Sequence, residues 1–341
     1  MKFLKKINFL ILTWAIDAVE QDVDPKQAEM IDFAVGGQAV IEGVMMRAPS
    51  NVTIAVRKPD GTIKVRKKKY LTLTQKYSWL NLPILRGVIN LFEMMFVGTD
   101  AINYSANESI EEEEPKKGKE KKEPGKFLKI LEGFLFVASF VIALGISLTL
   151  FKVVPLGITT FIQDYFPLIE ENFMVFNLID GVLKMLIFLS YIFILSLIPS
   201  FRRVFEYHGS EHKSIRTYEA KEDLKPEKAK KHSRFHPRCG TSFILIVFVI
   251  SIIVYTFVPK QDTFLTNLGL RIMVLPFIAG ISYEYLKFSA KHSDKLFVRM
   301  MIAPGLWFQR LTTKEPDPKQ LAVGLKSLQE SLAMEKVLAK N

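Results

Sequence analysis

Four apolar stretches, each about as long as a lipid bilayer is thick, constrain the fold of this chain more than any other feature. A membrane-spanning helix needs roughly 20 predominantly apolar residues. Charged residues interrupt the second stretch, where Asp180 and Lys184 are four residues apart and can pair on one helix face. The sequence predicts an α-helical multi-pass membrane protein with four transmembrane helices. These helices are expected near residues 130–151, 176–199, 240–258 and 265–286.

The charges in the connections between these stretches predict which side of the membrane each connection faces. The connection after the first stretch contains one base, Lys152, and three acids, whereas residues 200–240 contain eleven lysines and arginines. Basic residues in short connections favour the cytoplasmic side. We therefore expect residues 200–240 and both termini to be cytoplasmic, and the protein to reside in the cell membrane.

The chain before the first stretch divides into three segments. Residues 1–30 combine lysines with an apolar run and predict an interfacial amphipathic helix, with a cleaved signal peptide as the alternative. Residues 31–107 predict a small cytoplasmic α+β domain, in which Lys58-Pro59-Asp60-Gly61 is the turn of a β-hairpin and a helix follows. Residues 108–126 are mainly Glu, Lys, Pro and Gly, a composition typical of a disordered charged tether.

The rest of the chain divides into two parts. Residues 127–299 form the predicted four-helix membrane domain, which includes the histidine-rich connection at residues 200–240. In residues 300–341, leucines recur at near-helical spacing after a Pro-rich break. This spacing predicts a cytoplasmic C-terminal helix that packs on the cytoplasmic domain.

A glycine-rich segment, GGQAVIEGVMMR at residues 36–47, precedes the hairpin. Its glycines permit a tight turn or a close approach of the backbone to a ligand, and the alternative is that they serve strand packing. A phosphate-binding loop is excluded here because the segment lacks the Gly-Lys-Ser/Thr ending. The residues that could form a site in this segment are Gly36, Gly37, Gln38, Glu42 and Arg47.

Four of the five histidines lie within residues 208–236. Three residues of this region, His208, Glu211 and His212, form an H-x-x-E-H pattern, and on a helix they share one face. In such a pattern two imidazoles can hold a divalent transition metal, with zinc the expected ion. Glu211 would then be the catalytic base that activates a bound water.

A catalytic zinc needs a third protein ligand. His236 and Cys239 directly precede the third apolar stretch and Glu284 ends the fourth, so the predicted topology brings all three to one cytoplasmic level. The alternative is that these residues only anchor helix ends and that Glu284 pairs with a base. We expect His232 and His292 to be solvated. The single cysteine excludes a disulfide within the chain.

Five separate motifs stand out along the chain: GGQAVIEGVMMR at residues 36–47, LRGV at 85–88, EYHGSEHKSIR at 206–216, HPRCGTS at 236–242 and RMMIAPGLW at 299–307. Together they resemble the DUF1385 family of bacterial integral membrane proteins. The resemblance covers most of the chain from Gly36 onward. It implies an integral membrane protein and a metal-dependent enzyme, without implying a substrate.

Two classes of function remain compatible with the sequence. The first is a metal-dependent hydrolase at the cytoplasmic membrane interface, with His208, His212 and either Cys239 or His236 as ligands and Glu211 as base. The second is a non-catalytic assembly factor, associated with membrane proteins, a translocon or a ribosome, whose basic cytoplasmic face binds anionic lipid, ribosomal RNA or another membrane complex.

The net charge of +11 does not decide between these classes, because cytoplasmic connections of membrane proteins are basic in any case. A transporter is a third possibility, but four spans with few polar groups offer little pathway unless the protein forms a homo-oligomer. No feature predicts specific DNA binding.

Overall fold

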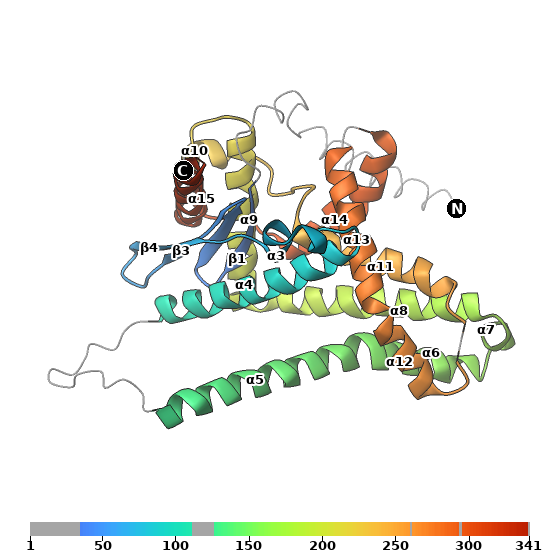
Figure 1. The fold of residues 1–341 in the computed structure, drawn as a ribbon. Coiled ribbons are helices and arrows are strands. Elements are labelled where there is room, and N and C mark those ends of the chain that lie inside the picture. The colour runs from blue at the N-terminus through green and yellow to red at the C-terminus, as the bar shows by residue number, and fades with distance from the viewer. Residues whose placement is uncertain (1–34, 111–125, 260, 293–294, 340–341) are drawn as a thin grey trace. The chain divides into compact units, whose positions relative to one another are not determined.

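The computed structural model describes residues 35–110, 126–259, 261–292 and 295–339 (Figure 1). The amphipathic helix expected over residues 1–30 lies outside the described residues. The expected tether at residues 108–126 also lies outside them, except at its two ends. The described chain is mostly helical and contains one small β-sheet.

The β-sheet is a four-stranded antiparallel meander with the strand order β1-β2-β3-β4. The predicted hairpin is formed by β3 and β4, and its turn contains Gly61 with a φ of +86°, which glycine adopts without strain. The edge strand β4 contains four lysines and one arginine, and charged side chains on an edge strand oppose further strand pairing. The strands are β1 (Gly36–Val40), β2 (Gly43–Ala48), β3 (Asn51–Arg57) and β4 (Ile63–Lys69).

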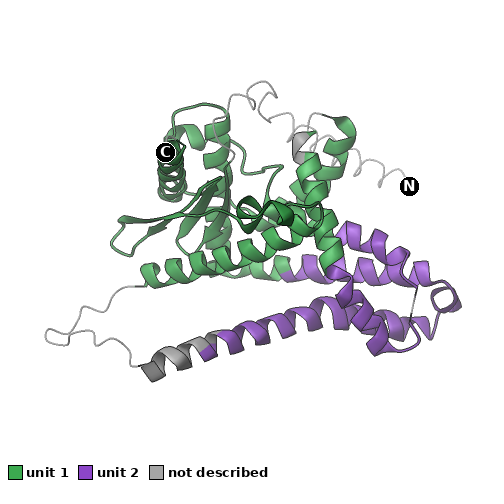
Figure 2. Cartoon of the chain, in the orientation of Figure 1, with its two compact units in different colours: residues 1–110, 192–247, 276–341 green, residues 111–191, 248–275 purple. Residues whose placement is uncertain are grey.

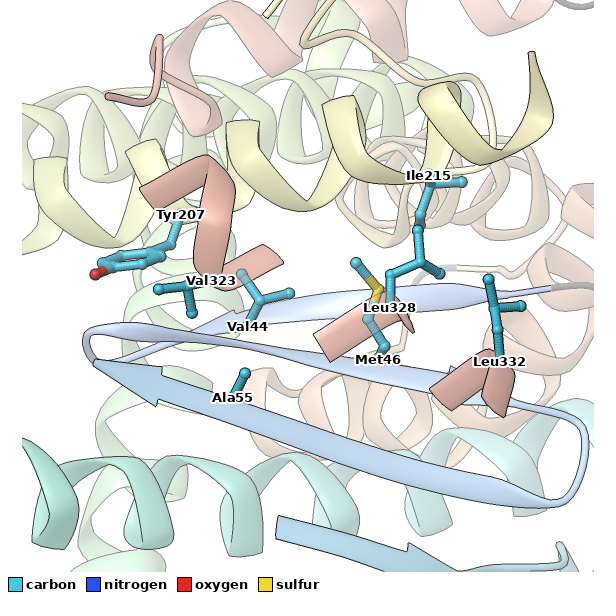
Figure 3. Packing of buried hydrophobic residues seen from close by; sticks show 8 residues of the cluster. All are labelled: Val44, Met46, Ala55, Tyr207, Ile215, Val323, Leu328 and Leu332. Atoms are coloured by element: carbon cyan, nitrogen blue, oxygen red, sulfur yellow. The ribbon is translucent and has the colours of Figure 1, made fainter. Parts of the chain in front are cut away.

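Helices cover both faces of the sheet because successive side chains of a strand point to opposite faces. Helices α9 (Pro199–Glu219) and α15 (Pro318–Leu338) contact one face, and α4 (Leu85–Ser109) contacts the other. Removing each large apolar side chain from water stabilises the fold by about 1.5–3 kcal/mol. The core beneath α9 and α15 contains Val44, Met46, Ala55, Tyr207, Ile215, Val323, Leu328 and Leu332 (Figure 3).

Two glycines allow α9 to pack closely against the C-terminal part of the chain. A Cβ atom on Gly209 would lie 2.1 Å from the carbonyl oxygen of Lys314, and one on Gly324 would lie 2.5 Å from Oγ of Ser210. The Ser210 hydroxyl donates to the carbonyl of Gln320, 2.8 Å away. Gly209 and Ser210 disfavour an isolated helix, but here they are the small residues that let α9 and α15 approach each other.

Three helical segments of the described chain are long and apolar enough to cross a membrane, so the protein is membrane-associated. They are Val137–Gln163, Phe173–Leu197 and Phe264–Ser289. The helix at the predicted third span, α11 (Gly240–Thr256), is also apolar but has only 17 residues. At 1.5 Å per residue it is about 25 Å long, less than the roughly 30 Å of a bilayer core.

Shorter elements complete the two compact units into which the chain divides (Figure 2). The first unit comprises Met1–Ile110, Ile192–Val247 and Pro276–Asn341, and the second comprises Glu111–Tyr191 and Phe248–Leu275. The first apolar segment combines α5 (Lys126–Leu148), the π-helix η2 (Thr149–Val153) and α6 (Val154–Gln163), the second is α8 (Phe173–Leu197), and the third combines α12 (Phe264–Met273) with α13 (Leu275–Lys291). The other helices are α3 (Leu73–Lys76), η1 (Ser78–Leu80), α7 (Pro167–Glu171), α10 (Pro226–Ala229) and α14 (Leu296–Thr312).

A buried ionic cluster lies among the helices of the second unit. Asp180 and Lys184 pair on α8 as their spacing predicts, and Arg271 of α12 also binds Asp180. Arg271 additionally donates to Asn177, which in turn donates to the backbone carbonyl of Tyr255, 2.6 Å away. Charged groups in an apolar helical layer are costly unless they are paired, so this cluster fixes how α8 and α12 pack.

Candidate metal centre

Helix α9 presents His208, Glu211 and His212 on one face, as the H-x-x-E-H spacing predicts. The segment, expected from its charges to be a connection, is helical from Pro199 to Glu219, with a proline in the first turn, where its missing N–H is not needed. One helical turn separates the two imidazoles, and their ring centroids are 4.5 Å apart.

Cys239 completes a set of three potential metal ligands. It lies in the turn that precedes α11, and its Sγ is 3.2 Å from Nε2 of His208. The ligand atoms of His208, His212 and Cys239 all lie within 4.8 Å of one another. Among the described residues, these three form a group of ligating side chains close enough to hold one metal ion.

Backbone carbonyl groups orient both imidazoles towards this point. Nδ1 of His208 is 2.8 Å from the carbonyl oxygen of Thr312, and Nδ1 of His212 is 2.5 Å from that of Arg234. A carbonyl oxygen can only accept, so each Nδ1 carries a proton, and in the neutral ring Nε2 is left with a lone pair. Hydrogen bonds of this kind to the second ring nitrogen commonly orient metal-binding histidines.

Glu211 lies beside the three ligands without belonging to their group. Its side chain is almost fully buried, and its Oε2 is 3.4 Å from Nε2 of His212. The backbone N–H of Gly37 in β1 donates to the carboxyl group. A Cβ atom on Gly37 would lie 2.6 Å from Cγ of Glu211, so the glycine-rich segment and the histidine motif meet at this contact.

Burial sets the protonation of the site. It raises the pKa of Glu211 to about 8 and lowers the pKa of His212 to about 4, so both side chains are mainly uncharged at pH 7. Burial also opposes ionisation of the Cys239 thiol, but the nearby His212 and Thr241 outweigh it and lower the pKa of the thiol. Neutral imidazoles and an easily ionised thiol are the forms that bind metal ions.

His236 lies next to His212, with ring centroids 5.7 Å apart, but its Nε2 is bound to a carboxylate. Its Nε2 is 3.1 Å from Oε2 of Glu219, a carboxylate that also pairs with Arg238. Although burial acts in the opposite direction, His236 and Arg238 lower the pKa of Glu219 to about 2. The Gln309 amide holds the backbone of His236 on both sides, accepting from its N–H and donating to its carbonyl. This arrangement supports the loop that carries Cys239.

The other candidate residues lie elsewhere in the first unit. Glu284 binds the guanidinium of Arg86 through both carboxylate oxygens. His232 is 3.7 Å from a carboxylate oxygen of Glu222, and His292 stacks on the ring of Phe288. None of these side chains belongs to the group of potential ligands, which among the described residues consists of His208, His212 and Cys239.

Only Gly37 of the glycine-rich segment contacts the site. Glu42 pairs with Arg203 of α9 at the turn between β1 and β2, and Gln38 lies under Gly98 of α4. A Cβ atom on Gly36 would meet no atom within 4 Å. Arg47 faces α4, on the other side of the sheet from Gly37 and Glu211.

Sequence reasoning missed Glu219, the partner of His236. Its signal is a spacing of seven residues from His212, which on a helix returns to the same face after two turns. The contact between Gly37 and Glu211 had no sequence signal, because it joins segments that are far apart in the chain.

Comparison with known proteins identifies relatives of this sequence. The sequence model of a family described as "Protein of unknown function (DUF1385)" matches residues 82–334. A protein of Bacillus subtilis (strain 168) named "Uncharacterized protein YqhQ" is 34% identical over 316 residues, which cover 90% of this chain and 95% of the relative. No solved structure matches the chain.

Proposed function

This chain belongs to the DUF1385 family, and from that premise we propose that it is a membrane-embedded, metal-dependent hydrolase. The observation that carries the proposal is the convergence of His208, His212 and Cys239, whose ligand atoms lie within 4.8 Å of one another. The family description assigns no activity, so the chemistry is argued from the side chains alone.

The donor set fits zinc. Two imidazole nitrogens and one thiolate are ligands that zinc prefers, and three protein ligands with one open position are typical of catalytic zinc. Zn–N and Zn–S bonds of about 2.0 and 2.3 Å put neighbouring ligand atoms of a tetrahedral site about 3.3–3.6 Å apart. The separation of 3.2 Å between His208 Nε2 and Cys239 Sγ is close to this value.

Glu211 is suited to move a proton at this site. A zinc ion held there would polarise a substrate and lower the pKa of a coordinated water. The Glu211 carboxyl reaches His212 on one side and is held by the N–H of Gly37 on the other, so its position is fixed. A zinc ion held beside Glu211 would lower the pKa of its carboxyl group, and the ionised carboxylate would accept a proton from the attacking water and return it to the leaving group.

The proposed topology puts this chemistry at the cytoplasmic surface of the cell membrane. His208 follows the end of α8 by a few helical turns, and Cys239 directly precedes α11. The eleven bases of residues 200–240 favour the cytoplasmic side for this connection. In this topology α11 is the third of four crossings, and flanking residues or local thinning of the bilayer compensate for its short length.

Metal analysis of the purified protein tests the proposal. We expect wild-type protein, purified in detergent without chelators, to contain close to one zinc or another transition-metal ion per chain. The variant His208→Ala/His212→Ala should lose it, whereas His232→Ala/His292→Ala, which removes two histidines outside the site, should retain it. Metal-free wild-type protein, or equal metal contents in both variants, would overturn the proposal.

A second pair of variants separates catalysis from metal binding. Glu211→Gln should keep the metal and lose metal-dependent hydrolysis of a panel of nitrophenyl esters and phosphates. Cys239→Ser should lose both the metal and the hydrolysis. If the wild type binds metal but Glu211→Gln leaves every function of the protein intact, the protein is better explained as a non-catalytic assembly factor.

A further inference from the structure

A polar pocket of about 320 Å³ lies in the first unit, on the α4 side of the sheet and apart from the metal centre. Residues of β2, α3, α4 and α13 line it. Three of its lining residues, Arg47, Arg86 and Lys287, are basic. Arg47 belongs to the glycine-rich segment but is not part of the candidate metal centre.

The three cations of the pocket share one carboxylate, that of Glu284, among the described residues. Arg86 is neutralised by Glu284, which binds its guanidinium with both oxygens. The guanidinium of Arg47 lies against the sulfur of Met94 and 5.4 Å from the centre of the Tyr70 ring, and both are weak acceptors. Lys287 is exposed, and its charge acts on the same Glu284 carboxylate, which is already bound to Arg86. The pocket therefore carries a net positive charge.

A chain of neutral hydrogen bonds fixes one wall of the pocket. The Thr74 hydroxyl donates to Oδ1 of Asn90 at 2.9 Å, and the Asn90 amide donates to the hydroxyl of Tyr283 at 3.0 Å. These bonds join α3, α4 and α13. The hydroxyl proton of Tyr283 is left to donate to a ligand, so the wall adds a neutral donor to the two cations.

The position of the pocket along the apolar segment indicates the source of the ligand. Tyr283 and Lys287 lie in the last two turns of the segment Phe264–Ser289, where tyrosine and lysine commonly mark the membrane interface. A phospholipid presents its phosphate group at this level of a bilayer, so we expect the ligand to come from the lipid.

We propose that this pocket binds the phosphate group of an anionic phospholipid, held by Arg47 and Lys287. The planar guanidinium of Arg47 can donate two parallel bonds to phosphate oxygens, and Lys287 adds a second charge at the rim. The acyl chains would lie along the apolar segment Phe264–Ser289, to which Tyr283 and Lys287 belong. The proposal is independent of the metal centre, which lies on the opposite face of the sheet.

Lipid titration followed by native mass spectrometry tests the pocket. The full-length protein in detergent is titrated with dioleoylphosphatidylglycerol and, separately, with dioleoylphosphatidylcholine. We expect a preference for the anionic lipid, and an affinity at least ~10-fold lower in Arg47→Gln/Lys287→Gln, since each charge-assisted bond accounts for roughly one order of magnitude. The control Lys69→Gln/Lys319→Gln removes the same charge from exposed positions outside the pocket and should bind like the wild type.

Two further arms make the result decisive. Lys287→Glu changes one exposed side chain, so it should fold normally and still weaken binding of the anionic lipid. A titration with inorganic phosphate asks whether the phosphate must be part of a lipid. Equal affinity for both lipids, no effect of Lys287→Glu, or displacement of the lipid by millimolar phosphate would each overturn the assignment to an anionic phospholipid.

Discussion

His208 and His212 are oriented by backbone carbonyl groups, and this makes the candidate metal centre a property of the folded chain. The carbonyls belong to Thr312 and Arg234, which are distant from α9 in the sequence. A carbonyl group cannot reorient without moving its helix or loop, so each Nε2 lone pair is fixed before any ligand arrives. Such preorganisation lowers the entropic cost of binding.

Gly37 and Gly36 provide a matched test of the contact between β1 and Glu211. A Cβ atom at Gly37 would lie 2.6 Å from Cγ of Glu211 and 2.8 Å from the carbonyl of Met45, whereas Gly36 has open space. We expect Gly37→Ala to destabilise the protein by about 1–3 kcal/mol, as overpacking does, and to displace Glu211. Gly36→Ala should change stability by less than about 0.5 kcal/mol. Thermal unfolding in detergent measures both, and equal effects of the two variants would contradict the contact.

Glu219 should make stability depend on pH. Its pKa is lowered from 4.5 to about 2, so its stabilising effect is present above pH 4.5 and is lost as the pH falls through about 2. A shift of this size corresponds to roughly 3 kcal/mol. We expect Glu219→Gln to destabilise the protein at pH 7 and to flatten the dependence of stability on pH between 5 and 3. The control Glu227→Gln removes an exposed acid and should give the same curve of stability against pH as the wild type. If the curve of Glu219→Gln is parallel to that of the wild type, the ion pair is refuted.

Sequence patterns predicted the candidate metal ligands but could not select among them. The spacing of His208, Glu211 and His212 was sufficient to put them on one helix face. Cys239 and His236 are three residues apart, and only the turn between them decides that the thiol faces the imidazoles while His236 faces Glu219. That turn is held by tertiary contacts, so no local pattern encodes it.

At the level of elements, helix spacing and turn chemistry predicted the hairpin β3–β4 and helix α4. For β1 and β2 the glycines of residues 36–47 suggested strand packing, but the bounds of the two strands were not predicted, because glycine and methionine obscure the alternation that marks a strand. Helix α9 was taken for a connection because it is rich in charged residues. Its stability comes from burial of one face against the sheet and α15, which propensity alone does not reveal.

The ion pair between α8 and α12 predicts how much the packing of these helices depends on Asp180. Asp180 accepts from both Lys184 and Arg271, and all three side chains are nearly inaccessible to solvent. Asp180→Asn would leave two buried cations without their counter-charge, a change that costs about 3–5 kcal/mol when a buried pair is broken. We expect a large fall in thermal stability or in the amount of protein inserted.

Two comparisons separate the loss of the Asp180 charge from a general effect of removing an acid. Glu171→Gln removes an exposed acid from the neighbouring short helix and should behave like the wild type. Adding Arg271→Gln to Asp180→Asn removes one unpaired cation and should restore part of the stability. A wild-type stability for Asp180→Asn alone would show that the cluster does not fix the packing of α8 and α12.

For the whole molecule, each compact unit is assembled from segments that are interleaved along the chain. The β-sheet near the N-terminus shares a core with α9 and with α15 near the C-terminus, so the apolar helices are synthesised before this core can close. The apolar stretches predicted the membrane-associated character, because length and composition suffice for that. The packing of distant segments into one core could not be predicted, because the spacing of apolar residues within a segment does not show which other segment it contacts.

Cysteine labelling tests the proposed topology, because Cys239 is the only native thiol. On a Cys239→Ser background, Glu170→Cys and Asp262→Cys probe the connections before α8 and after α11, and Glu227→Cys probes the basic connection. If all four predicted segments cross the membrane, a membrane-impermeant maleimide should label the first two in intact cells and Glu227→Cys only after permeabilisation. Labelling of Glu227→Cys and Asp262→Cys from the same side would mean that α11 does not cross. The metal centre would then have to be explained on a three-span fold, with Cys239 anchored by a helix that lies within the interface.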